Sequence, residues 1–182
     1  MSLLKQWKKA FAGLLKSPII TFEKGLISKL KYTNEKNELH RDPEIGPACI
    51  GYYGNGKIRF ESYYENGKRH RLDGPAFISY YENGNIYHES YWVDGEKHRL
   101  DDPAFIIYYG NGNIRYEQYW VNGKKHRLDG PAYISYYENG NIHCEEYWVE
   151  GKIHRSESPA CIDYYENGNI DYKEYYVNGE RK

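Results

Sequence analysis

The sequence predicts an all-β repeat array: an elongated, twisted single sheet in which β-hairpins follow one another as an antiparallel meander. Each period contains an Asn-Gly pair, the strongest short signal for a hairpin turn. Tyrosine supplies 22 of the 182 residues, and its ring can be buried while its hydroxyl meets water, as a thin sheet requires. A fixed period indicates one supersecondary unit copied in tandem, and here prolines recur every 28 residues, at Pro47, Pro75, Pro103, Pro131 and Pro159.

The N-terminal residues 1–17 stand outside this period, and 2–16 are predicted to form an amphipathic helix. We expect this helix to cap the open end of the sheet, as terminal units of repeat arrays do. Alternatives are a helix that binds a membrane surface or a partner's groove, and a targeting presequence. Its apolar stripe and basic face are Leu3, Leu4, Trp7, Phe11, Leu14 and Leu15, with Lys5, Lys8, Lys9 and Lys16.

Residues 18–182 are predicted to contain six copies of the unit. The first copy, 18–46, is degenerate, and its residues 22–25 match residues 81–84 of a regular copy. The last copy, 159–182, is truncated, and its final strand carries charges that discourage pairing with other sheets. The complete copies are 47–74, 75–102, 103–130 and 131–158.

Each unit is predicted to be one hairpin, for which 75–102 serves as the example. Residues 76–81 are aromatic and β-branched and predict a first strand. Asn83-Gly84 lies in the tight turn, where positive φ angles are needed. A second strand follows at 86–93, and Asp94-Gly95 turns the chain back towards the next proline. Side chains alternate along a strand, so equivalent residues of successive copies should form ladders on one face.

The recurring histidines invite a metal hypothesis that the geometry opposes. Ligands of one zinc ion lie about 2 Å from the metal, whereas equivalent residues of adjacent units lie about 10 Å apart. We expect instead a local hydrogen bond between each histidine and the acidic residue three positions later. Three cysteines are too few for a disulfide framework, and we expect Cys49 and Cys161 to act as small apolar residues. The histidines are His40, His70, His98, His126 and His154.

The period, the Tyr-Tyr-x-Asn-Gly turn and the Tyr-Trp-x-x-Gly-Lys-x-His-Arg stretch resemble MORN repeats. The resemblance covers about residues 18–182 and is nearest to the variant MORN repeats, many of them labelled antitoxin-like, and to related arrays of phages and large DNA viruses. It implies hairpins stacked into an elongated sheet, and a role in protein contacts, membrane association or scaffolding. His-Arg-x-Asp-Gly-Pro replaces the usual His-Gly-x-Gly of MORN units here.

We therefore expect a non-enzymatic binding scaffold that sequesters or blocks a partner protein, as an antitoxin or a viral or phage inhibitor of a defence factor does. No recurring nucleophile, carboxylate pair or phosphate-binding loop indicates catalysis, and no cofactor or metal is expected. A face rich in tyrosine, serine, asparagine and tryptophan resembles an antibody paratope. The residues expected to contact the partner are Tyr64, Trp92, Trp120, Trp148 and Tyr176, with the loop arginines Arg71, Arg99, Arg127 and Arg155.

Two alternative functions follow from other features of the chain. The basic N-terminal helix would anchor a membrane-peripheral scaffold, and the basic rim of loops would bind a phosphorylated or nucleic-acid ligand. The net charge of −1, from 25 basic and 26 acidic side chains, argues against a general nucleic-acid binder. A homodimer is left open. We expect the protein in the cytoplasm of a bacterial or eukaryotic host, with membrane association as the alternative.

Overall fold

The structure is a computed structural model that describes residues 17–182, and the helix predicted over 2–16 lies outside them. The chain divides into two compact units: the first runs to Ile86 and includes Tyr91–Gly95, and the second comprises Tyr87–Ser90 and Glu96–Lys182. All regular elements of the described residues are strands or turns. The predicted all-β class is therefore confirmed for this part of the chain.

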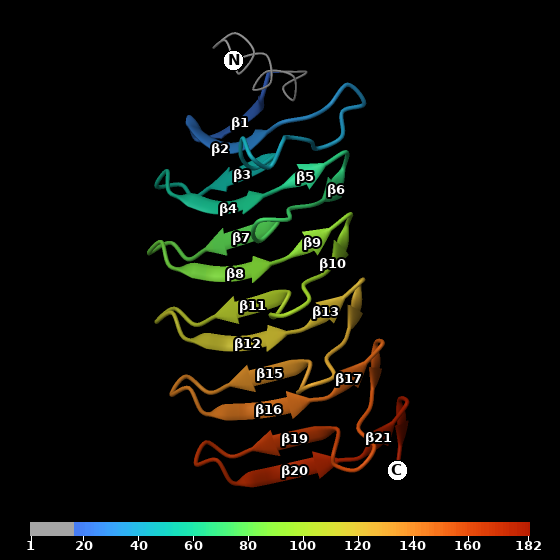
Figure 1. Ribbon diagram of the computed structural model, residues 1–182. Coiled ribbons are helices and arrows are strands. Elements are labelled where there is room, and N and C mark those ends of the chain that lie inside the picture. Colours follow the sequence, from blue (N-terminus) through green and yellow to red (C-terminus); the bar gives the residue numbers. More distant parts are fainter. Residues whose placement is uncertain (1–16) are drawn as a thin grey trace, which may run out of the picture. The chain divides into compact units, whose positions relative to one another are not determined.

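The long strands of each unit pair antiparallel in chain order (Figure 1). The first unit has the order β1-β2-β3-β4-β7, and the second has β8-β11-β12-β15-β16-β19-β20, which confirms the predicted meander of hairpins. The first unit's long strands are β1 Ile19–Glu23, β2 Leu26–Lys31, β3 Cys49–Tyr52, β4 Ile58–Ser62 and β7 Phe77–Tyr80. Those of the second are β8 Ile86–Ser90, β11 Phe105–Tyr108, β12 Ile114–Gln118, β15 Tyr133–Tyr136, β16 Ile142–Glu146, β19 Cys161–Tyr164 and β20 Ile170–Glu174.

Each copy after the first contains a second, shorter hairpin that was not predicted as separate from the long one. The single strand predicted at 86–93 is wrong, because it breaks at Tyr91 into β8 and a two-residue strand. In the next copy, Tyr119 is the equivalent of Tyr91, and its amide donates to the carbonyl of Ala132. The residue before Ala132, which would continue the pairing, is Pro131. Proline has no N–H to extend the ladder, so the chain turns away there. The short strands are β5 Tyr64–Glu65, β6 Lys68–Arg69, β9 Trp92–Val93, β10 Glu96–Lys97, β13 Trp120–Val121, β14 Lys124–Lys125, β17 Trp148–Val149, β18 Lys152–Ile153, β21 Tyr176–Val177 and β22 Glu180–Arg181.

The two hairpins of a copy use different turns. In the short hairpin Asn122 and Gly123 both have positive φ, 49° and 73°, as a two-residue type I′ turn requires. In the long hairpin only Gly112 is positive, at 94°, and the side chain of Asn111 accepts from the amide of Asn113. The predicted hairpin turn at the Asn-Gly pair is therefore present, with positive φ at the glycine alone.

The first copy differs from the alignment proposed for it. Lys24 and Gly25 both have positive φ, 50° and 79°, so β1 and β2 are joined by the two-residue turn that other copies keep for the short hairpin. Its second hairpin is reduced to a bridge between Thr33 and Leu39. The sequence match of 22–25 with 81–84 therefore does not correspond to the same turn geometry.

The core is thin and has buried residues on both faces of the strands, alanine and isoleucine on one face and Ser90 and Ile107 on the other. The alanine after each proline is fully buried, with no exposed surface at any of the five positions, and the largest side chain that is fully buried in the described residues is that of Ser90. Ile106, Ile134 and Ile162 are less than 9 % exposed on the same face. The packed Ala-x-Ile side that the sequence suggested is confirmed. The alanines are Ala48, Ala76, Ala104, Ala132 and Ala160.

The two tyrosines that close each first strand tie neighbouring hairpins together. The hydroxyl of Tyr136 donates to Glu117 of the preceding copy at 3.1 Å, and that of Tyr137 donates to the carbonyl of Tyr164 in the next copy at 2.7 Å. Burial raises the pKa of the Glu117 carboxyl, which is only 9 % exposed. The sequence analysis missed this glutamate, although one recurs in the second strand of four copies. The other pairs are Tyr80 with Glu61, Tyr108 with Glu89 and Tyr164 with Glu145.

Candidate functional site

In four of the five His-Arg pairs the guanidinium of the arginine lies over a tyrosine ring. The guanidinium carbon of Arg127 is 3.9 Å from the ring centroid of Tyr119. Its Nη1 donates to the carbonyl of Pro131 at 3.3 Å, and its Nε donates to Asp129 at 2.8 Å. That hydrogen bond lowers the pKa of the Asp129 carboxyl. The same stack joins Arg41 to Tyr32, Arg71 to Tyr63 and Arg155 to Tyr147.

The recurring Gly-Pro-Ala sequence fits this arrangement residue by residue. A methyl group on Gly130 would lie 3.0 Å from the Arg127 guanidinium carbon, so glycine leaves room for the stack. The proline carbonyl accepts from the arginine, and the alanine fills the core. Where Asp102 replaces the glycine, Arg99 donates to its carboxylate at 2.7 Å. The four arginines predicted to contact a partner thus already have partners within their own loops.

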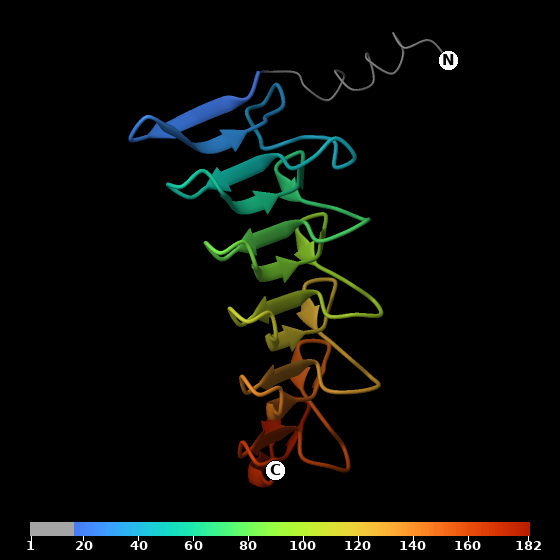
Figure 2. The same cartoon turned by 90° about the vertical axis from the view of Figure 1, so that its left-hand side faces the viewer.

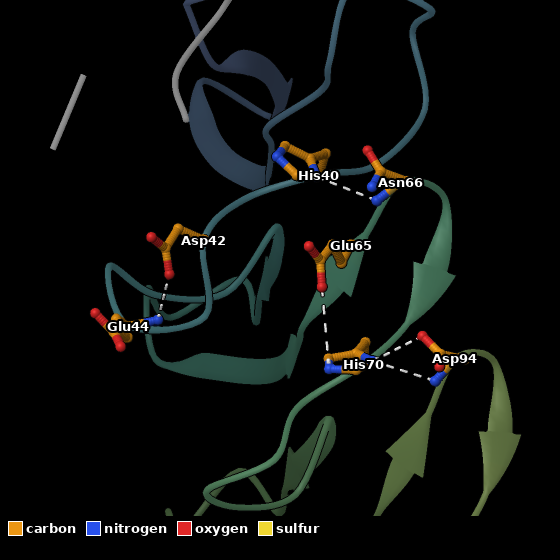
Figure 3. Close-up of polar contacts among 7 residues, drawn as sticks. All are labelled: His40, Asp42, Glu44, Glu65, Asn66, His70 and Asp94. Carbon is orange, nitrogen blue, oxygen red and sulfur yellow. Dashed lines mark hydrogen bonds and ion pairs between the residues drawn. The ribbon is translucent and has the colours of Figure 1, made fainter. Parts of the chain in front are cut away.

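The predicted local pairing of histidine with the acidic residue three positions later is wrong. Nδ1 of His70 instead accepts from the backbone amide of Asp94 at 3.2 Å, in the short-hairpin turn of the next copy, and also lies 3.1 Å from the Asp94 carboxylate (Figure 3). Asp73, three residues after His70, binds Arg71. The contact recurs between His40 and Asn66, His98 and Asn122, His126 and Glu150, and His154 and Asn178.

This histidine contact supports a backbone conformation that most residues avoid. Each turn residue whose amide is bound has positive φ, and in Glu150 the angle is 49°. Such angles are uncommon for residues other than glycine. Because each histidine is an acceptor in its own inter-repeat contact, the structure does not gather them, and the described residues contain no group of three or more potential metal ligands.

Trp92, Trp120 and Trp148 lie half-buried on the face of the strands opposite the buried alanines. The ammonium of Lys97 lies 4.6 Å from the Trp120 ring centroid and 4.4 Å from that of Phe105. The indole N–H of Trp120 donates to the side chain of Gln118. We call this surface of the second unit the aromatic face; it comprises Phe105, Tyr116, Tyr133, Trp120 and Trp148, with Lys97 and Lys125.

The first unit carries the same motif with arginine in place of lysine. Arg69 lies over Phe77 at 4.8 Å, over Trp92 at 5.3 Å and over Tyr64 at 5.7 Å. Phe60 and Phe77 stack with their centroids 6.0 Å apart. In the last copy Tyr176 donates through its hydroxyl to Glu174. Of the predicted series, Tyr64, Trp92, Trp120 and Trp148 are thus each in contact with a cation, which the sequence had placed in the loops.

Two surface hollows lie between successive connecting loops, at corresponding places in the two units. The hollow of the second unit has a volume of about 380 Å³ and includes Leu100, Leu128 and Val121 in its lining. That of the first unit has about 280 Å³ and includes Pro43, Leu72 and Glu65. Carboxylates line both, namely Asp101 and Asp129 in the second, and Asp42, Glu44 and Asp73 in the first.

The three cysteines are free thiols. Burial, together with the neighbouring carboxylates, raises the pKa of the Cys161 thiol to about 11, and burial also raises that of Cys49. Thiols with raised pKa values are poor nucleophiles, which agrees with the expectation that they serve as small apolar residues. Among residues 17–182 no helix has the length and apolar character needed to span a bilayer.

Comparison with known families supports the repeat assignment. The model of the MORN repeat variant matches five segments, 48–66, 76–94, 104–122, 132–150 and 161–178, which together make up slightly more than half of the chain. Each segment begins at or next to the buried alanine and ends in or near the turn of the short hairpin. No curated protein matches the chain. The protein therefore belongs to the MORN repeat variant family.

Proposed function

We propose that the protein is a non-enzymatic scaffold that binds a partner protein and blocks or sequesters it. Repeats of this family are commonly binding repeats for proteins or membranes. The observation that carries the proposal is the aromatic face, where rings and cations from successive copies form one continuous ladder in the second unit. In a sheet with a thin core, most side chains are at least partly exposed and can contact a partner.

The composition of this face suits protein recognition. Tyrosine and tryptophan give rigid contact area at low entropic cost, and they are enriched at the centres of interfaces. Lys125 lies over Tyr133 and Trp148 and within 3.6 Å of Glu146, so its ammonium is positioned before a partner arrives. Preorganised side chains lose less entropy on binding.

Affinity capture with the full chain tests the proposal. The chain should recover a stoichiometric protein from a host lysate, the double variant Trp120→Ala/Trp148→Ala should lose it, and circular dichroism should show that the variant keeps its sheet. The control is Tyr165→Ala, a tyrosine that is 51 % exposed beside a long-hairpin turn. Equal recovery by the tryptophan variant would contradict the choice of face, and repeated empty captures at low salt would contradict the scaffold.

The blocking role is tested with the captured partner. Its activity should fall in proportion to the amount of added chain and reach its minimum at the stoichiometry of binding. Full partner activity in the saturated complex would contradict an antitoxin-like or inhibitory role. We propose the cytoplasm as the compartment, because all three cysteines are unpaired and reduced thiols are typical there.

A further inference from the structure

Three leucines are the most exposed of the large hydrophobic residues in the described part of the chain. Leu72, Leu100 and Leu128 are 79 %, 70 % and 80 % exposed, and each follows the arginine of a His-Arg pair. The fold does not require an apolar residue there, because the loop at 155–159 has the exposed Ser156 at the same position. A single exposed leucine is ordinary, but apolar residues that gather into a patch rimmed by polar groups mark an interaction site.

In the second unit these leucines form the rim of a hollow. Leu100 and Leu128 come from successive loops, with Val121 and Tyr119 between them. Such connections project from one edge of the paired strands in Figure 2. The Asp101 carboxylate beside them forms no ion pair within the described residues. The hollow therefore combines apolar walls with a free negative charge.

The hollow of the first unit has the same place in the repeat and a stronger charge. Leu72 and Pro43 supply its apolar surface, and Glu65 stands where Val121 stands in the other hollow. Figure 3 labels three of its carboxylates, Asp42, Glu44 and Glu65, of which Glu65 lies 3.9 Å from Nε2 of His70. Among its lining residues no lysine or arginine is present, and the carboxylates are Asp42, Glu44, Glu65 and Asp73.

We propose that this loop edge binds a segment of a partner protein in the polyproline II conformation, with an apolar side chain at every third residue and lysine or arginine between them. The proposal rests on the proposed protein-binding function and adds a second surface to it. Successive loops are two strands apart, or about 10 Å, and a polyproline II chain advances about 3.1 Å per residue with three residues per turn, so every third side chain lies on the same side. Leu100 and Leu128 thus match ligand residues three apart, and the carboxylates match its cations.

Charge also distinguishes this ligand from a membrane. The same leucines could enter a bilayer, but the carboxylates beside them would face the anionic headgroups of a typical cytoplasmic surface and be repelled. A basic peptide satisfies both the apolar and the acidic groups of the hollows, so it is the occupant that the lining favours.

Fluorescence anisotropy with the full chain tests the proposal. The probe is a labelled 12-residue peptide of four Leu-Lys-Gly repeats, compared with four Leu-Glu-Gly repeats. The lysine probe should bind, and the glutamate probe should not. Leu100→Ser/Leu128→Ser, which copies the natural Ser156 loop, should weaken binding about tenfold or more, the equivalent of losing part of two buried leucine side chains. Asp101→Asn should weaken it about threefold.

Three results would overturn the proposal: equal binding of both probes, unchanged binding by the leucine variant, or no binding of the lysine probe at about 1 mM. Flotation on vesicles with 30 % phosphatidylserine that depended on the same leucines would also overturn it, in favour of a membrane. In affinity capture, one outcome is that the leucine variant recovers the partner and yet fails to bind the probe. That result would support the protein-binding function and would show that this partner binds the aromatic face. If the variant recovers the partner and binds the probe normally, only the loop-edge proposal fails.

Discussion

Replacing Arg127 by methionine should destabilise the second unit by about 2 kcal/mol. The side chain is 24 % exposed and stacks on Tyr119 at 3.9 Å, and a partly desolvated cation–π contact contributes about 1 kcal/mol. Its hydrogen bond to the Pro131 carbonyl, at 3.3 Å, adds about 1 kcal/mol. We count nothing for the ion pair with Asp129, because that carboxylate is exposed to solvent.

Urea unfolding followed by circular dichroism measures the effect, which for a change of about 2 kcal/mol corresponds to a midpoint shift of about 1 M. Arg115→Met is the matched control, because Arg115 is exposed and its guanidinium carbon lies 5.8 Å from the Tyr109 ring centroid; it should change stability by less than about 0.5 kcal/mol. Arg127→Lys should behave like the methionine variant, because lysine keeps the charge and loses the planar group. A lysine variant as stable as the wild type would refute the stacking argument.

Three further predictions concern single contacts. Burial raises the pKa of Tyr164 to about 12 from 10.0, so the hydroxyl of the unfolded chain loses its proton at a lower pH than that of the folded chain. The stability that this shift contributes is fully present below pH 10 and should be lost between pH 10 and 12. Urea titrations should show this loss, and Tyr164→Phe should show less of it. Gly51→Ser should destabilise by about 1–3 kcal/mol, because a Cβ there would overlap the Phe60 ring; the double variant with Phe60→Cys, a pair that a later copy carries, should unfold at nearly the wild-type urea concentration. His126→Ala should cost about 1 kcal/mol and speed hydrogen exchange at the Glu150 amide that it binds; unchanged exchange would argue that the contact contributes nothing.

The repeat and its antiparallel meander could be predicted because a period of 28 residues and hairpin turn signals are local features of the sequence. The break at Tyr91 and its equivalents could not, because the residues before and after it are equally good strand formers. What ends the strand is a proline on the neighbouring strand, and that proline had been interpreted only as a strand entrance. The short hairpin was missed for this reason, although its Asp94-Gly95 turn had been recognised.

For a related reason, some residues of the candidate surfaces could be predicted and their contacts could not. The tryptophan series was found because large aromatic residues at equal spacing stand out, but nothing local shows that Lys97 rather than Arg99 lies over the rings. His70 was paired with Asp73 because they are close in sequence. The structure joins His70 to Asp94, 24 residues away in the chain, and contacts between copies of this kind require the stacking of hairpins to be known first. The glutamates that bind Tyr80, Tyr108, Tyr136 and Tyr164 were missed for the same reason, because each pair joins residues 19 apart in neighbouring copies.

In the recurring loop sequence His-Arg-Leu-Asp-Gly-Pro-Ala, leucine is the residue that has no structural role within the chain. The histidine supports the neighbouring turn, the arginine stacks and binds the proline carbonyl, the glycine makes room for it, and the alanine fills the core. Leucine alone has no such role, since it is 80 % exposed at Leu128, while every residue around it is occupied in holding its backbone in place. A rigid loop that presents an apolar side chain loses little entropy when that side chain is covered. The contacts that fix the loop therefore also preorganise the leucine for binding. For this reason Arg127→Met should weaken binding of the lysine probe although both leucines are present.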